Sequence, residues 1–198
     1  MNVLVIGGGG REHAICLSIS NSNLLDELYC VPGNPGIENI ATCISGDIMD
    51  NDFILNTCKE NSIDFVIVGP EAPFNNGVTD ILQNENIYVF GPDSKAAKLE
   101  GSKIFMKDLC KKYEIPSADY ETFSDADSAI SYLDSKTLPI VVKANGLAAG
   151  KGVIIANEKS QGISAINDML INNKFGSAGS SIVIEEFLEG RETSFFII

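Results

Sequence analysis

In the first half of the chain, short apolar segments alternate with segments of helical periodicity, and this alternation restricts the fold more than any other feature. The apolar segments are rich in β-branched and aromatic residues, as buried strands are; they are Val3–Ile6, Leu28–Val31, Phe65–Val68 and Tyr88–Phe90. Between them, Asp50–Asp52 offer a helix N-terminus, and Val78, Ile81 and Leu82 repeat at helical spacing. This order predicts an α/β fold in which a parallel sheet has helices on both faces.

The pattern changes near residue 100, where a second unit is expected to begin. Ser102 is predicted to cap a helix that runs through Tyr113 and ends at Ile115–Pro116. Three lysines of this helix fall on one stripe, most of which is expected to face water; they are Lys103, Lys107 and Lys111. A pair resembling a capping box, Ser124 with Asp127, is expected to begin the next helix.

Three further strands are predicted in this second unit, at Ile140–Ala144, Val153–Ala156 and Ile182–Glu186. The loop NGLAAGKG joins the first two strands, which predicts a hairpin. A helix that carries Ile163, Ile166 and Leu170 separates the second strand from the third. The second unit is therefore expected to be a mixed α+β structure.

Charge and cysteine content argue against several kinds of partner and site. The formal net charge of −13 argues against a nucleic-acid partner, because such proteins neutralise phosphates with lysine and arginine. The five cysteines include no pair at CxxC spacing, so neither a disulfide framework nor a zinc knuckle is predicted. No apolar run approaches the ~20 residues of a membrane helix. A signal peptide is not expected either, because Met1 and Asn2 lead directly into the first predicted strand without a basic segment. We expect a cytoplasmic protein with no membrane or nucleic-acid partner.

The stretch VLVIGGGGREHAI, residues 3–15, combines a strand, a glycine turn and a helix start. It does not fit the dinucleotide fingerprint G-x-G-x-x-G, because the third glycine position falls on Glu12 or His13. The acidic residue that would bind the ribose is also missing, so NAD is not predicted. A helix dipole, main-chain amides and one guanidinium still predict an anion site; its residues are Gly8, Gly9, Gly10 and Arg11. A tight turn that needs glycine is the alternative.

Two more loops are expected at the same edge of the sheet, where ligands of open α/β sheets bind. One is PGNPG, which contains Asn34, and the other is VGPEAPFNNG, which contains Pro70 and Glu71. Glu71 offers an acceptor for hydroxyls or an amine, although a role in stabilising the turn explains it equally well. The three loops together suit a small phosphorylated sugar.

The second glycine loop lies in VVKANGLAAGKGVIIA, residues 141–156. It differs from a Walker loop in spacing, and it joins two strands instead of a strand and a helix. A hairpin of small residues with Lys143 at the end of one strand and Lys151 in the loop is suited to fold over a triphosphate. The stretch IVIEEFLEGRE, residues 182–192, then predicts a strand ending in acids, whose backbone would read adenine and whose carboxylate would bind the ribose.

Six stretches occur in order along essentially the whole chain: GGGGREHA, PGNPG, VGPEAP, GPDSKAAKLEGSK, KANGLAAGKGV and IEEFLEG. Together they resemble the phosphoribosylamine–glycine ligases, or glycinamide ribonucleotide synthetases, of the ATP-grasp superfamily. The resemblance implies a Rossmann-like pre-ATP-grasp domain at residues 1–102. It also implies an incomplete ATP-grasp domain at 103–198, with a lid subdomain at about 121–190.

The resemblance implies an ATP-dependent carbon–nitrogen ligase of purine biosynthesis. In that family's reaction, ATP phosphorylates the carboxylate of glycine. The amine of 5-phosphoribosylamine then attacks the glycyl phosphate, which gives glycinamide ribonucleotide, ADP and phosphate. The glycine run after the first strand would accordingly bind the phosphate of phosphoribosylamine.

The resemblance also implies roles for individual residues. Lys103 and Lys143 match lysines that contact ATP phosphates, residues 185–188 match the adenine hinge, and Glu192 matches the ribose acceptor. The full set of implied ATP-binding residues is Lys103, Lys143, Gly146, Gly150, Lys151, Gly152, Glu185, Glu186, Phe187, Leu188 and Glu192. The implied substrate-binding residues are Gly8, Gly9, Gly10, Arg11, Asn34, Pro70 and Glu71. No catalytic residue and no metal ligand is assigned within the chain.

Two departures from the family pattern bear on function. Asn145 stands where the family usually has aspartate, and the family's chains are considerably longer than this one. We therefore expect an inactive, monomeric amino-terminal fragment, with the ligands for Mg²⁺ or Mn²⁺ beyond residue 198. Two alternatives remain open: another ATP-grasp ligase or carboxylase, and a nonenzymatic nucleotide-binding module.

Overall fold

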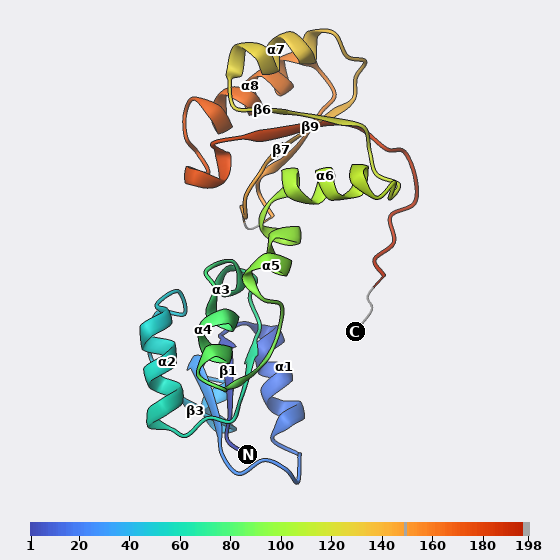
Figure 1. Cartoon of the computed structure of the whole chain (residues 1–198). Helices are drawn as coiled ribbons and strands as arrows, with labels where there is room; N and C mark the ends of the chain where they lie inside the picture. Colours follow the sequence, from blue (N-terminus) through green and yellow to red (C-terminus); the bar gives the residue numbers. More distant parts are fainter. Residues whose placement is uncertain (149, 196–198) are drawn as a thin grey trace. The chain divides into compact units, whose positions relative to one another are not determined.

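A computed structural model describes residues 1–148 and 150–195, and the chain divides into two compact units (Figure 1). The first unit comprises Met1–Gly101 and the second Ser102–Ile198. Within the described residues, no helix combines the length and the apolar character needed to cross a bilayer. The five cysteines are all free thiols. Burial raises the pKa of the Cys58 thiol to about 12, so this cysteine remains neutral and packs as an apolar residue.

The first unit is built on a five-stranded parallel sheet in the order β3-β2-β1-β4-β5. Its strands are β1 (Val3–Gly7), β2 (Leu28–Pro32), β3 (Thr42–Cys43), β4 (Phe65–Val68) and β5 (Tyr88–Phe90). The four predicted strands are confirmed to within one residue at their ends. The edge strand β3 was not predicted, because two residues are too few to show a pattern.

Helices cover both faces of this sheet, as predicted (Figure 1). They are α1 (Gly10–Ile19), η1 (Ile37–Asn39), α2 (Asn51–Glu60), α3 (Ala72–Asn75), α4 (Val78–Asn84) and α5 (Ser94–Gly101). Because side chains of a strand alternate between faces, Leu4 and Ile6 of β1 pack with α2 and α4, whereas Val3 and Val5 pack with α1 and η1. Both faces of β1 are buried, which explains its unbroken apolar sequence.

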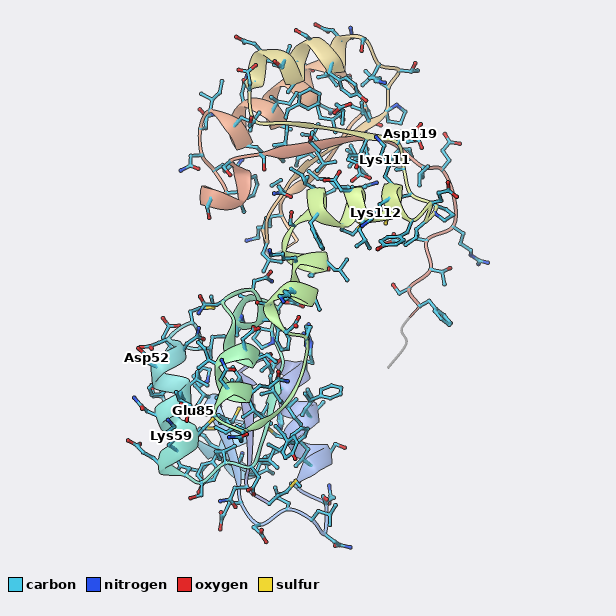
Figure 2. All side chains as sticks on the ribbon, viewed as in Figure 1. Asp52, Lys59, Glu85, Lys111, Lys112 and Asp119 are labelled. Atoms are coloured by element: carbon cyan, nitrogen blue, oxygen red, sulfur yellow. The ribbon has the colours of Figure 1, made fainter. Side chains whose placement is uncertain are left out.

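The start of α2 provides a test of the predicted N-cap. Asp50 Oδ1 accepts a hydrogen bond of 3.0 Å from the Phe53 N–H. Replacing Asp50 by alanine is expected to lower the free energy of unfolding by about 1 kcal/mol, measured by urea denaturation of the 198-residue chain. The matched control is Asp52→Ala on the first turn of α2 (Figure 2). This change is expected to lower the free energy of unfolding by only a few tenths of a kcal/mol. Equal losses of unfolding free energy in the two variants would contradict the role of Asp50 as the N-cap.

The second unit contains a four-stranded antiparallel sheet in the order β6-β9-β7-β8. Its strands are β6 (Tyr120–Phe123), β7 (Ile140–Ala144), β8 (Val153–Ala156) and β9 (Ile182–Glu186). Its helices are α6 (Lys103–Lys112), α7 (Ala126–Asp134), α8 (Lys159–Leu170) and the short η2 (Gly176–Gly179). The bounds predicted for β7, β8 and β9 are confirmed, as are the hairpin and the Ser102 cap of α6.

One detail of the predicted helix starts is wrong. The N-cap of α7 is Asp125, whose carboxylate accepts from the Ser128 N–H at 2.8 Å, and not Ser124 paired with Asp127. Aspartate and serine are comparably good N-caps, so the local sequence gave no basis for choosing between adjacent positions. The apolar repeat of α7 that includes Ala129 and Leu133 is buried as expected.

The two faces of the second sheet differ in character. One face packs against α7 and α8 through a core that includes Val142, Ile166 and Ile184 (Figure 1). Strand alternation and pairing place Lys143 of β7 and Glu185 of β9 on the other face. The sheet therefore has one apolar face, which packs into the core, and one face that carries charged side chains.

Most of the lysine stripe of α6 was expected to face water, and Lys107 is an exception. Its side chain is only 2% exposed, and its ammonium contacts Glu185 of the same unit. The periodicity of α6 placed the lysines on one face correctly, but no local signal indicated that an acid distant in sequence would cover one of them. Lys111, one turn later, is exposed.

Candidate functional site

Three loops that the sequence predicted at one sheet edge meet at the carboxyl ends of β1, β2 and β4. The Asn34 side chain donates to the Gly8 carbonyl at 2.9 Å, and Gly8 has so little space that an added Cβ would lie 2.5 Å from the Gly33 carbonyl oxygen. Pro70 lies against Gly7, where an added Cβ would be 3.0 Å from the proline Cδ. The first glycine run therefore packs between the other two loops.

Arg11 extends from the first turn of α1 across this edge. Its guanidinium donates to the Gly69 carbonyl and lies 3.5 Å from a carboxylate oxygen of Glu71. Both charged side chains remain more than half exposed, so this ion pair contributes little to stability. The first amides of a helix have no partner within the helix, so the N–H groups of Gly10 and Arg11 are available at the start of α1, the turn from which the Arg11 side chain extends. An anion placed there would meet a helix dipole and a positive charge.

Glu12 is a component of this edge that the sequence analysis did not identify as such. It is buried, and its carboxylate accepts a hydrogen bond of 2.6 Å from the Gly9 N–H. An added Cβ at Gly69 would lie 2.0 Å from the same carboxylate. Glu12 occupies the N3 position of α1, three residues after the N-cap Gly9. Because a glutamate at N3 commonly binds the N-cap amide, this spacing was the sequence signal that could have identified it. The Gly9 amide is consequently engaged within the protein.

In the second unit, the glycine loop that follows β7 is joined to the first turn of α6. The Asn145 Oδ1 accepts from the Ile104 N–H at 2.9 Å and from the Ser102 hydroxyl at 3.1 Å. The Lys103 ammonium donates to the Gly146 carbonyl at 3.1 Å. Lys103 and the glycine loop, which the sequence predicted as parts of one phosphate site, are therefore adjacent. Only the acceptor oxygen of Asn145 makes these contacts, so the departure from aspartate preserves them.

Close packing and backbone conformation explain why glycine occupies several positions of this loop. An added Cβ at Gly146 would lie 2.8 Å from Ala178, and one at Gly152 would lie 2.6 Å from the Ala148 side chain. Gly150 has a φ of +74°, which glycine adopts without strain. Ala149, in the same loop, lies outside the described residues. The glycine content alone is thus explained by close packing and one left-handed turn, and the argument for a phosphate site rests on the lysines.

Lys143 and Lys107 share one buried carboxylate. Glu185 has a side chain only 5% exposed; its Oε1 lies 2.6 Å from the Lys143 ammonium and its Oε2 lies 2.8 Å from the Lys107 ammonium. Lys143 is 27% exposed, in contrast to the buried Lys107. The cluster carries one negative and two positive charges, so it has a net charge of +1 beside the glycine loop. Such a surplus favours an anionic ligand.

Tyr120 borders this cluster and stays neutral. Its ring lies 5.5 Å from the Lys107 ammonium, an arrangement that favours the cation. Its hydroxyl donates to Asp108 at 2.6 Å. This hydrogen bond, assisted by desolvation, raises the pKa of Tyr120 to about 12, so the phenol adds no negative charge near the lysines at neutral pH.

The segment predicted to contact adenine and ribose leaves the sheet at the end of β9. Glu186 pairs with Asp119: its N–H donates to the Asp119 carbonyl, and its carboxylate accepts from the Asp119 N–H, both at 3.0 Å. Phe187, Leu188 and Glu192 are exposed. The carboxylates of Glu185 and Glu186 are thus engaged within the protein, and both residues belong to β9, which pairs with β6 and β7.

The charged sheet face also has an apolar part. Val153 and Ile155 of β8 pair with Lys143 and Val141 of β7, and both β8 side chains are more than two-fifths exposed. A flat aromatic base would cover such side chains next to a positive charge. A separate cavity of about 580 Å³ lies between β8 and α8 and is lined by Ile154, Ala165 and Met169; among the predicted site residues only Lys151 borders it.

Family models match both units of the chain. The model described as phosphoribosylglycinamide synthetase, N domain, matches residues 1–100, and that described as phosphoribosylglycinamide synthetase, ATP-grasp (A) domain, matches residues 101–198. The chain belongs to the phosphoribosylglycinamide synthetase family. The family resemblance deduced from the six sequence stretches is thereby confirmed.

Curated relatives and solved structures agree with this family. The phosphoribosylamine–glycine ligase of Agrobacterium fabrum is 49% identical over the whole chain, which covers 47% of that relative. The crystal structure of phosphoribosylamine–glycine ligase from Thermotoga maritima matches with a TM-score of 0.79 and 30% identity, covering 96% of this chain and 45% of that one. The chain therefore spans about half the length of the relatives it matches.

A more distant structure shares the fold alone. The biotin carboxylase domain of the 2-oxoglutarate carboxylase from Hydrogenobacter thermophilus matches with a TM-score of 0.77 at 16% identity, over 95% of this chain and 44% of that one. It was crystallised with MgADP. At this identity the match supports the α/β and ATP-grasp architecture and says nothing of the reaction.

The described residues do not fit a metal site. They gather no group of three or more histidine, cysteine, aspartate or glutamate side chains around one point. Mg²⁺ prefers several oxygen ligands from carboxylates, phosphates and water, whereas both oxygens of Glu185 face ammonium groups. The expectation that metal ligands of the phosphoribosylglycinamide synthetase family lie outside these residues stays a prediction.

Proposed function

We propose that this chain forms the amino-terminal part of an ATP-dependent ligase that joins glycine to 5-phosphoribosylamine. The observation that carries the proposal is the pair of family matches, one on each unit. Arg11 at the start of α1 in the first unit and the Lys107–Glu185–Lys143 cluster in the second unit support it. The reaction transfers the terminal phosphoryl group of ATP to the glycine carboxylate. The amine of phosphoribosylamine then displaces phosphate from the glycyl phosphate, which forms the amide of glycinamide ribonucleotide.

The first unit supplies the site for the phosphate of phosphoribosylamine in this proposal. Arg11 and the amides of Gly10 and Arg11 bind the phosphate, because a guanidinium and a helix N-terminus each favour an anion. Gly8 and Gly9 shape the turn, and Asn34 supports it through the Gly8 carbonyl. Pro70 and Glu71 come from the third loop; Glu71 offers an acceptor to the sugar hydroxyls or to the amine.

The second unit supplies the nucleotide site in this proposal. Lys143 and Lys103 contact the phosphates, and the loop of Gly146, Gly150, Lys151 and Gly152 covers them. Val153 and Ile155 pack against the adenine, whose edge meets the main chain of residues 185–188. Glu192 accepts from the ribose hydroxyls. Residues 121–190 then form the lid of the ATP-grasp domain, and residues 1–102 the pre-ATP-grasp domain.

The divalent metal that assists phosphoryl transfer is proposed to be Mg²⁺ or Mn²⁺, held by residues beyond position 198. When bound, such a metal would supply positive charge to stabilise the phosphoryl group during transfer. No residue described above is assigned to it, and the roles of the lysines stand without it. We also propose a cytoplasmic, monomeric protein that acts on small molecules only, and we expect the 198-residue chain by itself to be inactive.

The first of the two alternative functions has little support. Another ATP-grasp ligase or carboxylase would share Lys103, Lys143 and the hinge, but the matching carboxylase structure is only 16% identical to this chain. A nonenzymatic nucleotide-binding module would bind ATP without turnover. Assaying the full-length protein with ATP, Mg²⁺, glycine and freshly prepared phosphoribosylamine decides between them. Release of ADP that requires both glycine and phosphoribosylamine supports the proposal, and release with bicarbonate in place of both refutes it.

Arg11 provides a specific test of the sugar-phosphate site. In the full-length protein, Arg11→Ala is expected to raise the KM for phosphoribosylamine by roughly ten- to a hundredfold, the equivalent of one lost charge-assisted contact. The KM for ATP should stay nearly constant, because among the described residues the Arg11 guanidinium contacts Gly69 and Glu71 of the first unit. The measurement is steady-state kinetics with each substrate varied in turn. If the change altered only the KM for ATP, the assignment of Arg11 to the sugar-phosphate site would be wrong.

A further inference from the structure

The three charges of the Lys107–Glu185–Lys143 cluster are held very differently. The Lys107 ammonium contacts Glu185 Oε2 at 2.8 Å, the Ser117 hydroxyl at 2.8 Å and the Ala118 carbonyl at 3.0 Å. An ammonium has three protons to donate, so these acceptors satisfy Lys107 fully. Its burial and its three partners fix it in place.

Lys143 is held by far less. In the part of the chain that the structure describes, its ammonium has one acidic or hydrogen-bonding neighbour, Glu185 Oε1, at 2.6 Å. This contact is a close ion pair without the alignment of a hydrogen bond, because Oε1 has no hydrogen-bond partner of good geometry. Lys143 is also the one member of the cluster that reaches solvent, with 27% of its side chain exposed. It is therefore the member that can change partner.

Exchange of partner by Lys143 has an electrostatic requirement. If its ammonium turned from Glu185 to an incoming phosphate, the buried carboxylate would lose one of its two counter-charges. A buried charge without a partner is strongly unfavourable. Lys107 removes this obstacle, because it stays bound to Oε2 and keeps Glu185 paired throughout.

We propose that Lys107 is a positioning residue of the nucleotide site: it keeps Glu185 paired and oriented so that Lys143 can exchange that carboxylate for an ATP phosphate. This inference rests on the proposed function, in which Lys143 binds phosphate. Lys107 itself touches no nucleotide; it acts through Glu185. This positioning role explains why Lys107, which lies on the same helix stripe as the exposed Lys111, is buried against Glu185, a carboxylate that is already paired with Lys143.

A double-mutant cycle in the full-length protein tests the inference. Lys107→Met is expected to raise the KM for ATP about tenfold or more, an effect of the size of one charge-assisted contact, and to leave the KM for glycine unchanged. In the Glu185→Gln background, where no buried charge needs compensation, the same Lys107→Met change should add almost nothing. Lys111→Met, one turn further along α6 (Figure 2), is the matched control and should match the unmutated protein.

The outcomes separate this inference from the proposed function. If Lys143→Met leaves the KM for ATP unchanged, the nucleotide site itself is wrong. If Lys143→Met raises that KM but Lys107→Met does not, or if Lys107→Met has the same effect with and without the Glu185 carboxylate, the positioning role alone is overturned and Lys107 merely packs. Should Lys107→Met fail to fold, Lys107→Gln retains a donor for Ser117 and the cycle is repeated with it.

Discussion

Replacing Lys143 by methionine is expected to lower kcat/KM for ATP in the full-length protein by roughly a hundredfold or more, the usual cost of losing one preorganised group that stabilises developing negative charge. The protein should still fold, because Glu185 stays paired with Lys107 at 2.8 Å. Steady-state kinetics at varied ATP gives the effect on turnover, and thermal unfolding confirms that the fold is retained.

The control for this variant is Lys159→Met. Lys159 begins α8, on the opposite side of the sheet from Lys143, and its ion pair with Asp134 is half exposed. Exposed pairs of this kind contribute little to stability. Loss of activity to the same degree in both lysine variants would contradict a specific role for Lys143.

Replacing Glu185 by alanine is expected to have the largest effect on stability. The change leaves the buried ammonium of Lys107, whose side chain is 2% exposed, without a counter-charge. Breaking a buried pair in this way costs about 3–5 kcal/mol. Urea denaturation of the 198-residue chain, followed by far-ultraviolet circular dichroism, measures the loss.

The double variant Lys107→Met with Glu185→Met should recover most of that stability, because two apolar side chains of similar size replace the ion pair. Glu189→Ala, a change at an exposed glutamate shortly after β9, should leave the unfolding midpoint unchanged. If Glu185→Ala were no more costly than Glu189→Ala, the carboxylate would not be essential for holding the cluster together.

Strands and loop positions were predictable because they depend on local pattern. The run Phe65–Val68 is apolar, the run Ile140–Ala144 is apolar except for Lys143, and both end at turn residues, so their bounds followed from composition alone. The meeting of the glycine run with Asn34 also followed, because loops after neighbouring parallel strands share an edge. These contacts required no knowledge of side-chain conformation.

The residues that the sequence analysis missed depend on tertiary contacts. Lys107 looked like its exposed neighbour Lys111, since nothing near it in sequence indicated Glu185 as its partner. Glu12 looked like an ordinary acid in the first turn of a helix, where acids are common. Its burial arises from the approach of the loop at Gly69, which comes much later in the chain. Periodicity assigns a face, but what covers that face is set by other segments.

The hydrogen bonds of Asn145 have a mechanical consequence. One oxygen atom accepts from the Ser102 hydroxyl and from the Ile104 N–H, while the Asn145 carbonyl accepts from the Lys103 N–H at 3.0 Å. The residue that begins the glycine loop is thus fastened at three points to the turn that carries Lys103. Displacing one relative to the other requires breaking several bonds at once, so the start of the loop and the first turn of α6 move together.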